Sequence, residues 1–175
     1  MSPSLSRGQE IVLPPSALRA LADAAAAAMP GGEGVLLEAG REVGRLLHPL
    51  VMKEEGGDAQ GSFWERLQMH LARRGLGSIR HRRIHPGIGL LESRGVAELA
   101  GEVAPGEARP FAPFTTGLLR GLLSAAAGRT VELRQLDGVI GGAPCRWVFG
   151  SSAALDALER GMERGRTLEE AVAEL

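Results

Sequence analysis

The chain of 175 residues has 44% hydrophobic residues and a formal net charge of -1. It can therefore form one domain with a core, and it carries no excess charge that would attract nucleic acid or an anionic membrane. Its single cysteine excludes an internal disulfide and fits a reducing compartment. No apolar run approaches the roughly 18 residues of a membrane helix, so we expect no membrane span. Together with the charge and the cysteine count, this favours a cytoplasmic protein with no nucleic-acid partner.

The N-terminal part of the chain predicts helices. Residues 1–13 are expected to form a polar arm, and residues 14–175 a single domain. The Pro-Pro-Ser sequence at the start of the domain favours a helix that ends near residue 29. A second helix is expected over 34–52, and Pro49 should kink it or end its regular part.

The remaining elements predict an α+β domain. Ser62 and Glu65 have the spacing of a capping box, which begins a third helix to about residue 74. The elements then follow in the order strand, strand, helix, strand, strand and two helices, which favours helices packed around a small antiparallel sheet. The expected elements are two strands within 78–94, a helical turn at 96–100, a helix over 114–127, strands at 130–136 and 144–149, a helix capped by Ser152, and a last helix whose capping box joins Thr167 and Glu170.

The stretch from residue 109 to residue 150 carries the most specific pattern, RPFAPFTTGLLRGLLS followed by CRWVFG at its end. It resembles the C-terminal signature of the 4-vinyl-reductase-type domain, a family with bacterial sensor members. The fold of that family is similar to that of subunits of the TRAPP trafficking complex. The resemblance implies a homodimer with a buried hydrophobic pocket in each subunit.

The resemblance also locates a degenerate zinc site. Sensor members of the family hold zinc through cysteines at the start of the helix and on both hairpin strands, together with a glutamate. These positions correspond here to Ala112, Arg134, Asp137 and Cys145. Because zinc prefers four sulfur or imidazole donors, we expect no zinc and no other cofactor, with an Arg134–Asp137 ion pair across the turn. Cys145 itself is either a buried core thiol or a reactive or acylated one.

Large and small side chains supply candidates for the pocket wall. Gly117 and Gly121, four residues apart, allow another backbone or a ligand to approach closely, so they predict either an interface or a pocket wall. Ordinary core packing is the alternative for most of the larger side chains. The pocket candidates are Phe63, Trp64, Met69, Phe114, Gly117, Leu118, Gly121, Leu122 and Trp147.

Polar residues give weaker signals. His81 and His85 alternate with Arg83 on one strand face, either as an exposed polar surface or as part of a metal site that needs a third ligand. A dense basic patch either is solvated or binds phosphate, a carboxylate ligand, an acidic partner or nucleic acid. This patch consists of Arg73, Arg74, Arg80, Arg82 and Arg83.

The sequence contains no nucleotide-binding fingerprint and no ordered catalytic triad. It therefore favours a non-catalytic domain that binds a small hydrophobic or tetrapyrrole-like molecule and acts as a sensor or carrier through a protein partner. Two alternatives remain. One is an accessory protein of tetrapyrrole vinyl reduction, and the other is a structural assembly subunit without a ligand.

Overall fold

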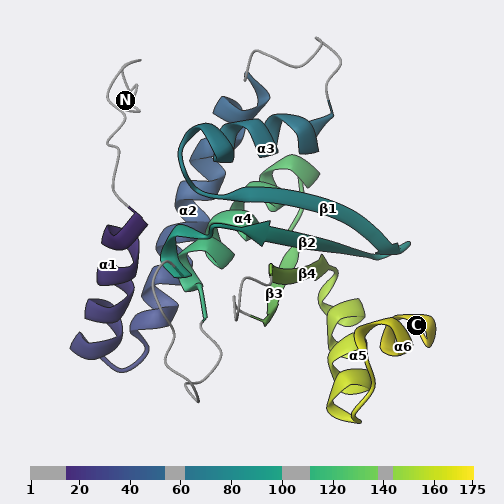
Figure 1. The fold of residues 1–175 in the computed structure, drawn as a ribbon. Coiled ribbons are helices and arrows are strands. Elements are labelled where there is room, and N and C mark those ends of the chain that lie inside the picture. Colours follow the sequence, from purple (N-terminus) through teal and green to yellow (C-terminus); the bar gives the residue numbers. More distant parts are fainter. Residues whose placement is uncertain (1–14, 54–61, 100–110, 138–143) are drawn as a thin grey trace.

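The computed structural model describes residues 15–53, 62–99, 111–137 and 144–175, so the predicted arm at 1–13 lies outside the described residues. The described elements follow the expected order (Figure 1). They are helices α1 (Pro15–Ala28), α2 (Gly32–Met52) and α3 (Phe63–Arg73), strands β1 (Ser78–His85) and β2 (Ile88–Arg94), the short 3-10 helix η1 (Ala97–Leu99), helix α4 (Pro113–Ala127), strands β3 (Glu132–Asp137) and β4 (Cys145–Gly150), and helices α5 (Ser152–Glu163) and α6 (Leu168–Ala173).

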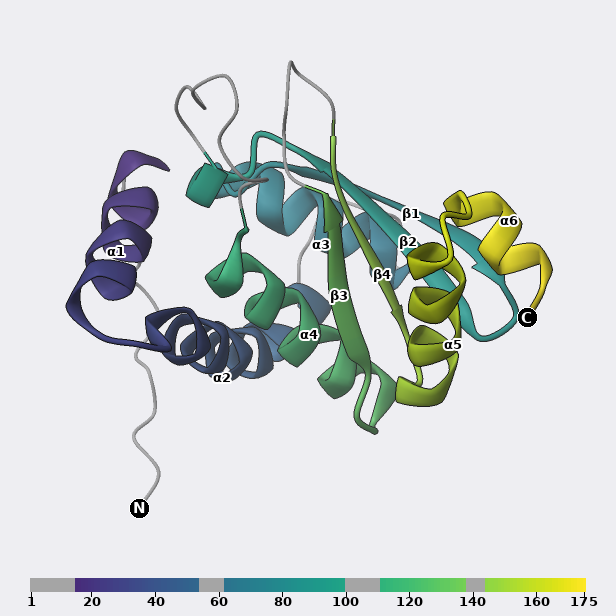
Figure 2. The same ribbon diagram turned by 90° about the horizontal axis from the view of Figure 1, so that it is seen from below.

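The four strands form one antiparallel sheet with the order β1-β2-β4-β3. The two hairpins, β1-β2 and β3-β4, join along β2 and β4 at the centre of the sheet. Figure 2 shows α3 and α4 on one side of the strands and α5 and α6 on the other. The α+β architecture with helices around a small antiparallel sheet is therefore confirmed.

Both faces of the central strands are buried because helices cover each of them. Side chains alternate along a strand, so Leu91 and Trp147, which are paired across β2 and β4, belong to the core beneath α3 and α4. The next pair, Leu90 and Val148, packs with α5 and α6 on the opposite face. All four side chains are at most 2% exposed.

Helices α2 and α4 pack backbone against backbone. A Cβ added at Gly117 would lie 1.9 Å from the carbonyl oxygen of Leu37, and one added at Gly121 would lie 2.0 Å from that of Arg41. Gly40 and Gly44 of α2 approach α4 equally closely. The small residues of α4 therefore form an interface within the chain.

Pro49 lies inside α2, which continues to Met52. The expectation that the regular helix might end before this proline is corrected. Pro49 sits in the last turn and is exposed, so the carbonyl that loses its amide partner there can bond to water instead.

The two predicted capping boxes are confirmed, whereas two single-residue caps are not; Ser16 of the Pro-Pro-Ser sequence lies inside α1, which begins at Pro15. The capping boxes of Ser62 with Glu65 and of Thr167 with Glu170 are present. Helix α5, however, is capped by Ser151, whose side chain accepts a hydrogen bond from the backbone N–H of Ala154, and not by Ser152 as expected. Ser151 has the extended backbone that a cap requires, whereas Ser152 is already helical.

Candidate functional site

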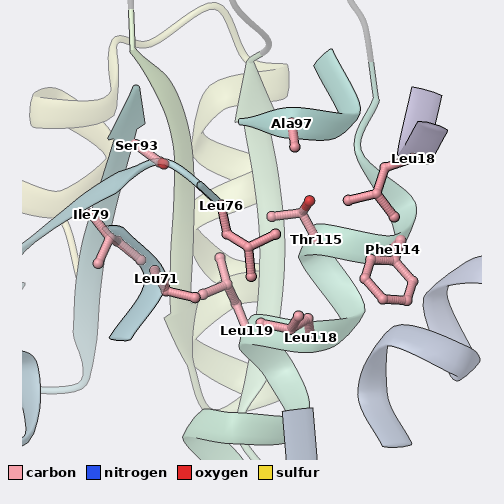
Figure 3. Close-up of a pocket in the computed structure, with 10 residues that line it drawn as sticks. All are labelled: Leu18, Leu71, Leu76, Ile79, Ser93, Ala97, Phe114, Thr115, Leu118 and Leu119. Atoms are coloured by element: carbon pink, nitrogen blue, oxygen red, sulfur yellow. The ribbon is translucent and has the colours of Figure 1, made fainter. Parts of the chain in front are cut away.

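An apolar cavity lies between the first turns of α4 and the start of the β1-β2 hairpin (Figure 3). The cavity has a volume of about 20 Å³. It therefore has room for about one water in this conformation. The lining residues are Leu18, Leu71, Leu76, Ile79, Ser93, Ala97, Phe114, Thr115, Leu118 and Leu119.

The polar chemistry of this cavity is confined to two hydroxyl groups. Ser93 and Thr115 line it among hydrocarbon side chains, and no lining side chain carries a charge (Figure 3). Ser93 is only 6% exposed and is paired across the sheet with Ile79 and Cys145. A mostly apolar enclosure with a few placed polar groups is the usual composition of a small-molecule site.

A buried carboxylate anchors the helix beside the cavity. The Glu98 side chain accepts hydrogen bonds from the backbone N–H of Phe114 at 3.0 Å, the backbone N–H of Thr115 at 2.8 Å and the Thr115 hydroxyl at 2.9 Å. These donors belong to the N-terminus of α4, where the unpaired amides and the helix dipole favour a negative charge. Burial nevertheless raises the pKa of the Glu98 carboxyl, and these hydrogen bonds only partly oppose that shift.

The two threonines of the FTTG sequence each have a distinct partner. Thr115 donates to Glu98, whereas the Thr116 hydroxyl accepts a hydrogen bond from the indole Nε1–H of Trp147 at 2.9 Å, fully buried. The first contact ties α4 to η1 and the second ties it to β4. The threonine pair thus fixes the orientation of α4 over the sheet, which sets the shape of the cavity.

The positions mapped onto the zinc site are joined by other contacts. The backbone N–H of Ala112 donates to the Gln135 side chain at 2.9 Å, which links the start of α4 to β3. Ala112 and Cys145 are both fully buried in the core. Among the residues that the structure describes, no group of three or more His, Cys, Asp or Glu side chains is arranged to hold a metal ion.

Arg134 does not point along its own turn. Its guanidinium forms ion pairs with Asp156 and Glu159 of α5, and thereby connects β3 to the C-terminal helices. The hydrogen bond to Asp156, and after it the negative charges of Glu159 and Asp156, raise the pKa of Arg134. The side chain of the expected partner, Asp137, lies outside the described residues. The α5 carboxylates were missed because they lie more than twenty residues after Arg134 in the sequence.

The pocket candidates are distributed over several parts of the fold. Phe114 and Leu118 line the cavity, whereas Leu122 and Trp147 are core residues and Met69 is half-buried on α3. Gly117 and Gly121 face the backbone of α2. The cavity contains residues that the sequence did not single out, chiefly Ser93, Ala97 and Ile79, because strand pairing and η1 bring them together.

Phe63 and Trp64 lie outside the cavity in an aromatic cluster on α3. The Trp64 indole stacks on the His81 imidazole with ring centroids 3.9 Å apart and planes 9° from parallel, and Phe149 contacts both rings. Burial lowers the pKa of His81. The cluster borders an open groove of about 480 Å³ that also includes Arg83, consistent with the predicted shared face of the strand.

The predicted basic patch is divided by strand alternation. Arg83 faces the aromatic groove, whereas Arg80 and Arg82 lie on the alternate face of β1, where Arg80 is opposite Glu92. Arg74 donates from its guanidinium to the backbone carbonyl of His70, and Arg73 is exposed at the end of α3. Arg83 nevertheless also borders a second open groove that Arg82 lines together with residues of α6.

Solved structures share this fold, among them a sensory domain and a vinyl-4-reductase family protein. The phenol-responsive sensory domain of the transcription activator PoxR, solved with phenol, is 21% identical with a TM-score of 0.62 over 91% of this chain and 83% of that chain. A vinyl-4-reductase family protein from Methanocaldococcus jannaschii is 19% identical with a TM-score of 0.52 over 82% of this chain and 83% of that chain. No protein-family model and no curated protein matches the sequence.

These comparisons confirm the fold that the sequence signature implied. The chain folds like a vinyl-4-reductase family protein and like the PoxR sensory domain, and the alignments cover most of each chain. At these identities the likeness concerns the fold. Within the described residues, no helix is both long enough and apolar enough to cross a membrane.

Proposed function

We propose that this chain is a non-catalytic domain that binds a small, uncharged, hydrophobic molecule and acts as a sensor or carrier. The observation that supports this function is the cavity beside α4, where eight apolar side chains surround the hydroxyls of Ser93 and Thr115. The proposal is independent of zinc, because the positions mapped onto the metal site hold Ala112, Arg134, Asp137 and Cys145.

The charge distribution around the cavity favours a neutral ligand. No lining side chain could neutralise a charged group, and transfer of an unpaired charge into an apolar site is costly. The buried Glu98 carboxylate behind Thr115 would in addition repel an anion. Ser93 can donate or accept one hydrogen bond, so a hydrocarbon ring with one hydroxyl group matches the wall better than a carboxylate does.

The cavity must widen to hold such a ring. A cavity of about 150 Å³ accommodates benzene, whereas this one has about 20 Å³. Leu18 covers it from α1, which contacts only α2 and η1 extensively within the described chain. We therefore expect Leu18 and α1 to move on binding, and a single ring to fit better than a tetrapyrrole with its four linked rings.

The comparisons support this proposal at the level of fold. The PoxR domain was solved with phenol and is described as phenol-responsive. We propose that a partner protein responds to the movement of Leu18 and α1 when the ligand binds. The alternatives, an accessory role in tetrapyrrole vinyl reduction and a structural assembly role without ligand, predict respectively reductant-dependent turnover and an empty cavity.

Thermal unfolding with three probes tests the proposal. Phenol and toluene should each raise the midpoint, and benzoate should not, because its carboxylate has no partner in the cavity. Saturation at about 100 times Kd stabilises by about 2.7 kcal/mol, or roughly 5–10 °C for a chain of this size. Ala97→Val, which fills the cavity, should abolish the shift, whereas the exposed control Ala153→Val should keep it. Equal shifts in both variants would contradict the assignment of this cavity.

A further inference from the structure

The aromatic groove, which is the open groove beside Trp64, is a second candidate site. It has a volume of about 480 Å³, and small-molecule sites usually have about 300–1,000 Å³. Its lining residues come from α3, from the β1-β2 hairpin, from β4 and from the connection between α4 and β3. The groove shares no lining residue with the apolar cavity. It can therefore bind a different molecule independently of that cavity.

Three aromatic rings line the groove, and a glycine makes room for one of them. Trp64 and His81 stack on each other, and Phe149 lies against both. Gly89 is paired with Phe149 across β2 and β4, and a Cβ added at Gly89 would lie 2.2 Å from the tip of the Phe149 ring. A larger residue there would displace this ring. Because burial lowers the pKa of His81 below 6.5, its ring is uncharged at neutral pH and serves as a flat aromatic surface.

Two arginines with no carboxylate partner line the same groove. Arg83 lies on β1 opposite Gly89, and Arg129 follows the end of α4. Both are exposed, and neither forms an ion pair with a described side chain. The nearby Arg120, in contrast, is neutralised by Glu132. Among the described residues that line the groove, none is Asp or Glu. The groove therefore has two positive charges that no acidic side chain of its wall balances.

We propose that the aromatic groove binds a small molecule in which a planar ring system carries a phosphate group, as in a nucleoside monophosphate. A phosphate monoester has a charge of about -1.5 to -2 at pH 7, which Arg83 and Arg129 balance. Guanidinium groups bind phosphate through paired N–H donors, so no glycine-rich phosphate loop is required. The base stacks on the aromatic rings of the wall. Benzoate matches this groove poorly, because it has a single ring and balances only one of the two charges.

Isothermal titration calorimetry of the full chain with three matched ligands tests this site. Adenosine monophosphate (AMP) should bind, whereas adenosine and inorganic phosphate should each bind at least about tenfold more weakly, because each lacks one half of the ligand. Arg83→Gln and Arg129→Gln should each weaken AMP binding by about ten- to a hundredfold. Both variants should fold, since both side chains are exposed. The control Arg94→Gln, exposed on β2 outside the groove, should bind AMP as the wild type does.

Two further measurements separate the ring contact and the apolar cavity from the charge contact. AMP should change the fluorescence of Trp64, because the other tryptophan, Trp147, is fully buried. Phe149→Leu should weaken AMP binding about fivefold or more without changing the binding of inorganic phosphate. Ala97→Val, which fills the apolar cavity, should leave AMP binding unchanged.

Three results would overturn the proposal. The first is a wild type that binds no AMP at millimolar concentrations. The second is an AMP affinity that survives both arginine changes. The third is inorganic phosphate that binds as tightly as AMP, because the aromatic wall would then have no part in binding. None of these results depends on whether phenol or toluene enters the apolar cavity, so this proposal and the proposed function can fail separately.

Discussion

The close contact between α2 and α4 predicts that two glycine-to-alanine changes have opposite effects on the free energy of unfolding. Helix propensity alone predicts that either change stabilises, by roughly 0.5–1 kcal/mol. For Gly34→Ala this should hold, because nothing lies within 4 Å of the new methyl group. For Gly117→Ala the methyl carbon would lie 1.9 Å from the Leu37 carbonyl oxygen and 2.9 Å from the backbone nitrogen of Arg41.

The size of the Gly117→Ala effect follows from what must move. An ordinary contact needs at least 3.4 Å, so the two helices would have to separate by about 1.5 Å at this point. The obstacle is backbone, which cannot turn aside as a side chain would. Overpacking of this kind costs typically 1–3 kcal/mol and sometimes more. We expect a net loss of about 2–3 kcal/mol after the propensity gain.

Urea unfolding of the wild type and the two variants measures both effects. Gly117→Ala should lower the free energy of unfolding by about 2–3 kcal/mol and the thermal midpoint by roughly 4–12 °C. Gly34→Ala should raise both slightly. A Gly117→Ala protein as stable as Gly34→Ala would refute the backbone-to-backbone packing of these helices.

Three other predictions concern the contacts around the cavity. Trp147→Phe removes the donor to the buried Thr116 hydroxyl and should lower the free energy of unfolding by about 1–3 kcal/mol; an unchanged urea midpoint would argue against this hydrogen bond. Because burial raises the folded-state pKa of Glu98 above 4.5, its favourable contribution is present below that pH and is lost as pH rises through the folded-state value. Wild type should therefore lose stability relative to Glu98→Gln as pH rises, and parallel pH curves would be inconsistent with that shift. Burial lowers the folded-state pKa of His81 below 6.5, so the favourable contribution of its neutral form is present above pH 6.5 and is lost as pH falls from there through the lower folded-state value. Trp64 fluorescence should titrate at that lower value in the wild type but not in His81→Gln.

Local signals in the sequence predicted most of the elements. Each capping box joins two residues only three positions apart, Ser62 with Glu65 and Thr167 with Glu170. Such a box can therefore be recognised from the sequence alone. The spacing of Gly117 and Gly121 likewise predicts the close approach of another backbone or a ligand. What they approach could not be predicted, because Gly40 and Gly44 become their counterparts only when α2 and α4 pack together.

The candidate site was less predictable because long-range contacts build it. Glu98 lies 16 residues before the helix amide that it binds, and Gln135 lies 23 residues after Ala112. Ser93 enters the cavity only through strand pairing and the position of η1. No spacing rule connects such residues, whereas the resemblance over 109–150 predicted the fold without locating the cavity.

Native mass spectrometry of the purified protein, followed by denaturation, tests the central claim of a small-molecule site most directly. We expect that the native protein carries a non-covalent small molecule, or takes up phenol when it is added, and that denaturation returns the bare chain of 18.4 kDa. A protein that carries no such mass and takes up neither phenol nor toluene would contradict it and favour the assembly role.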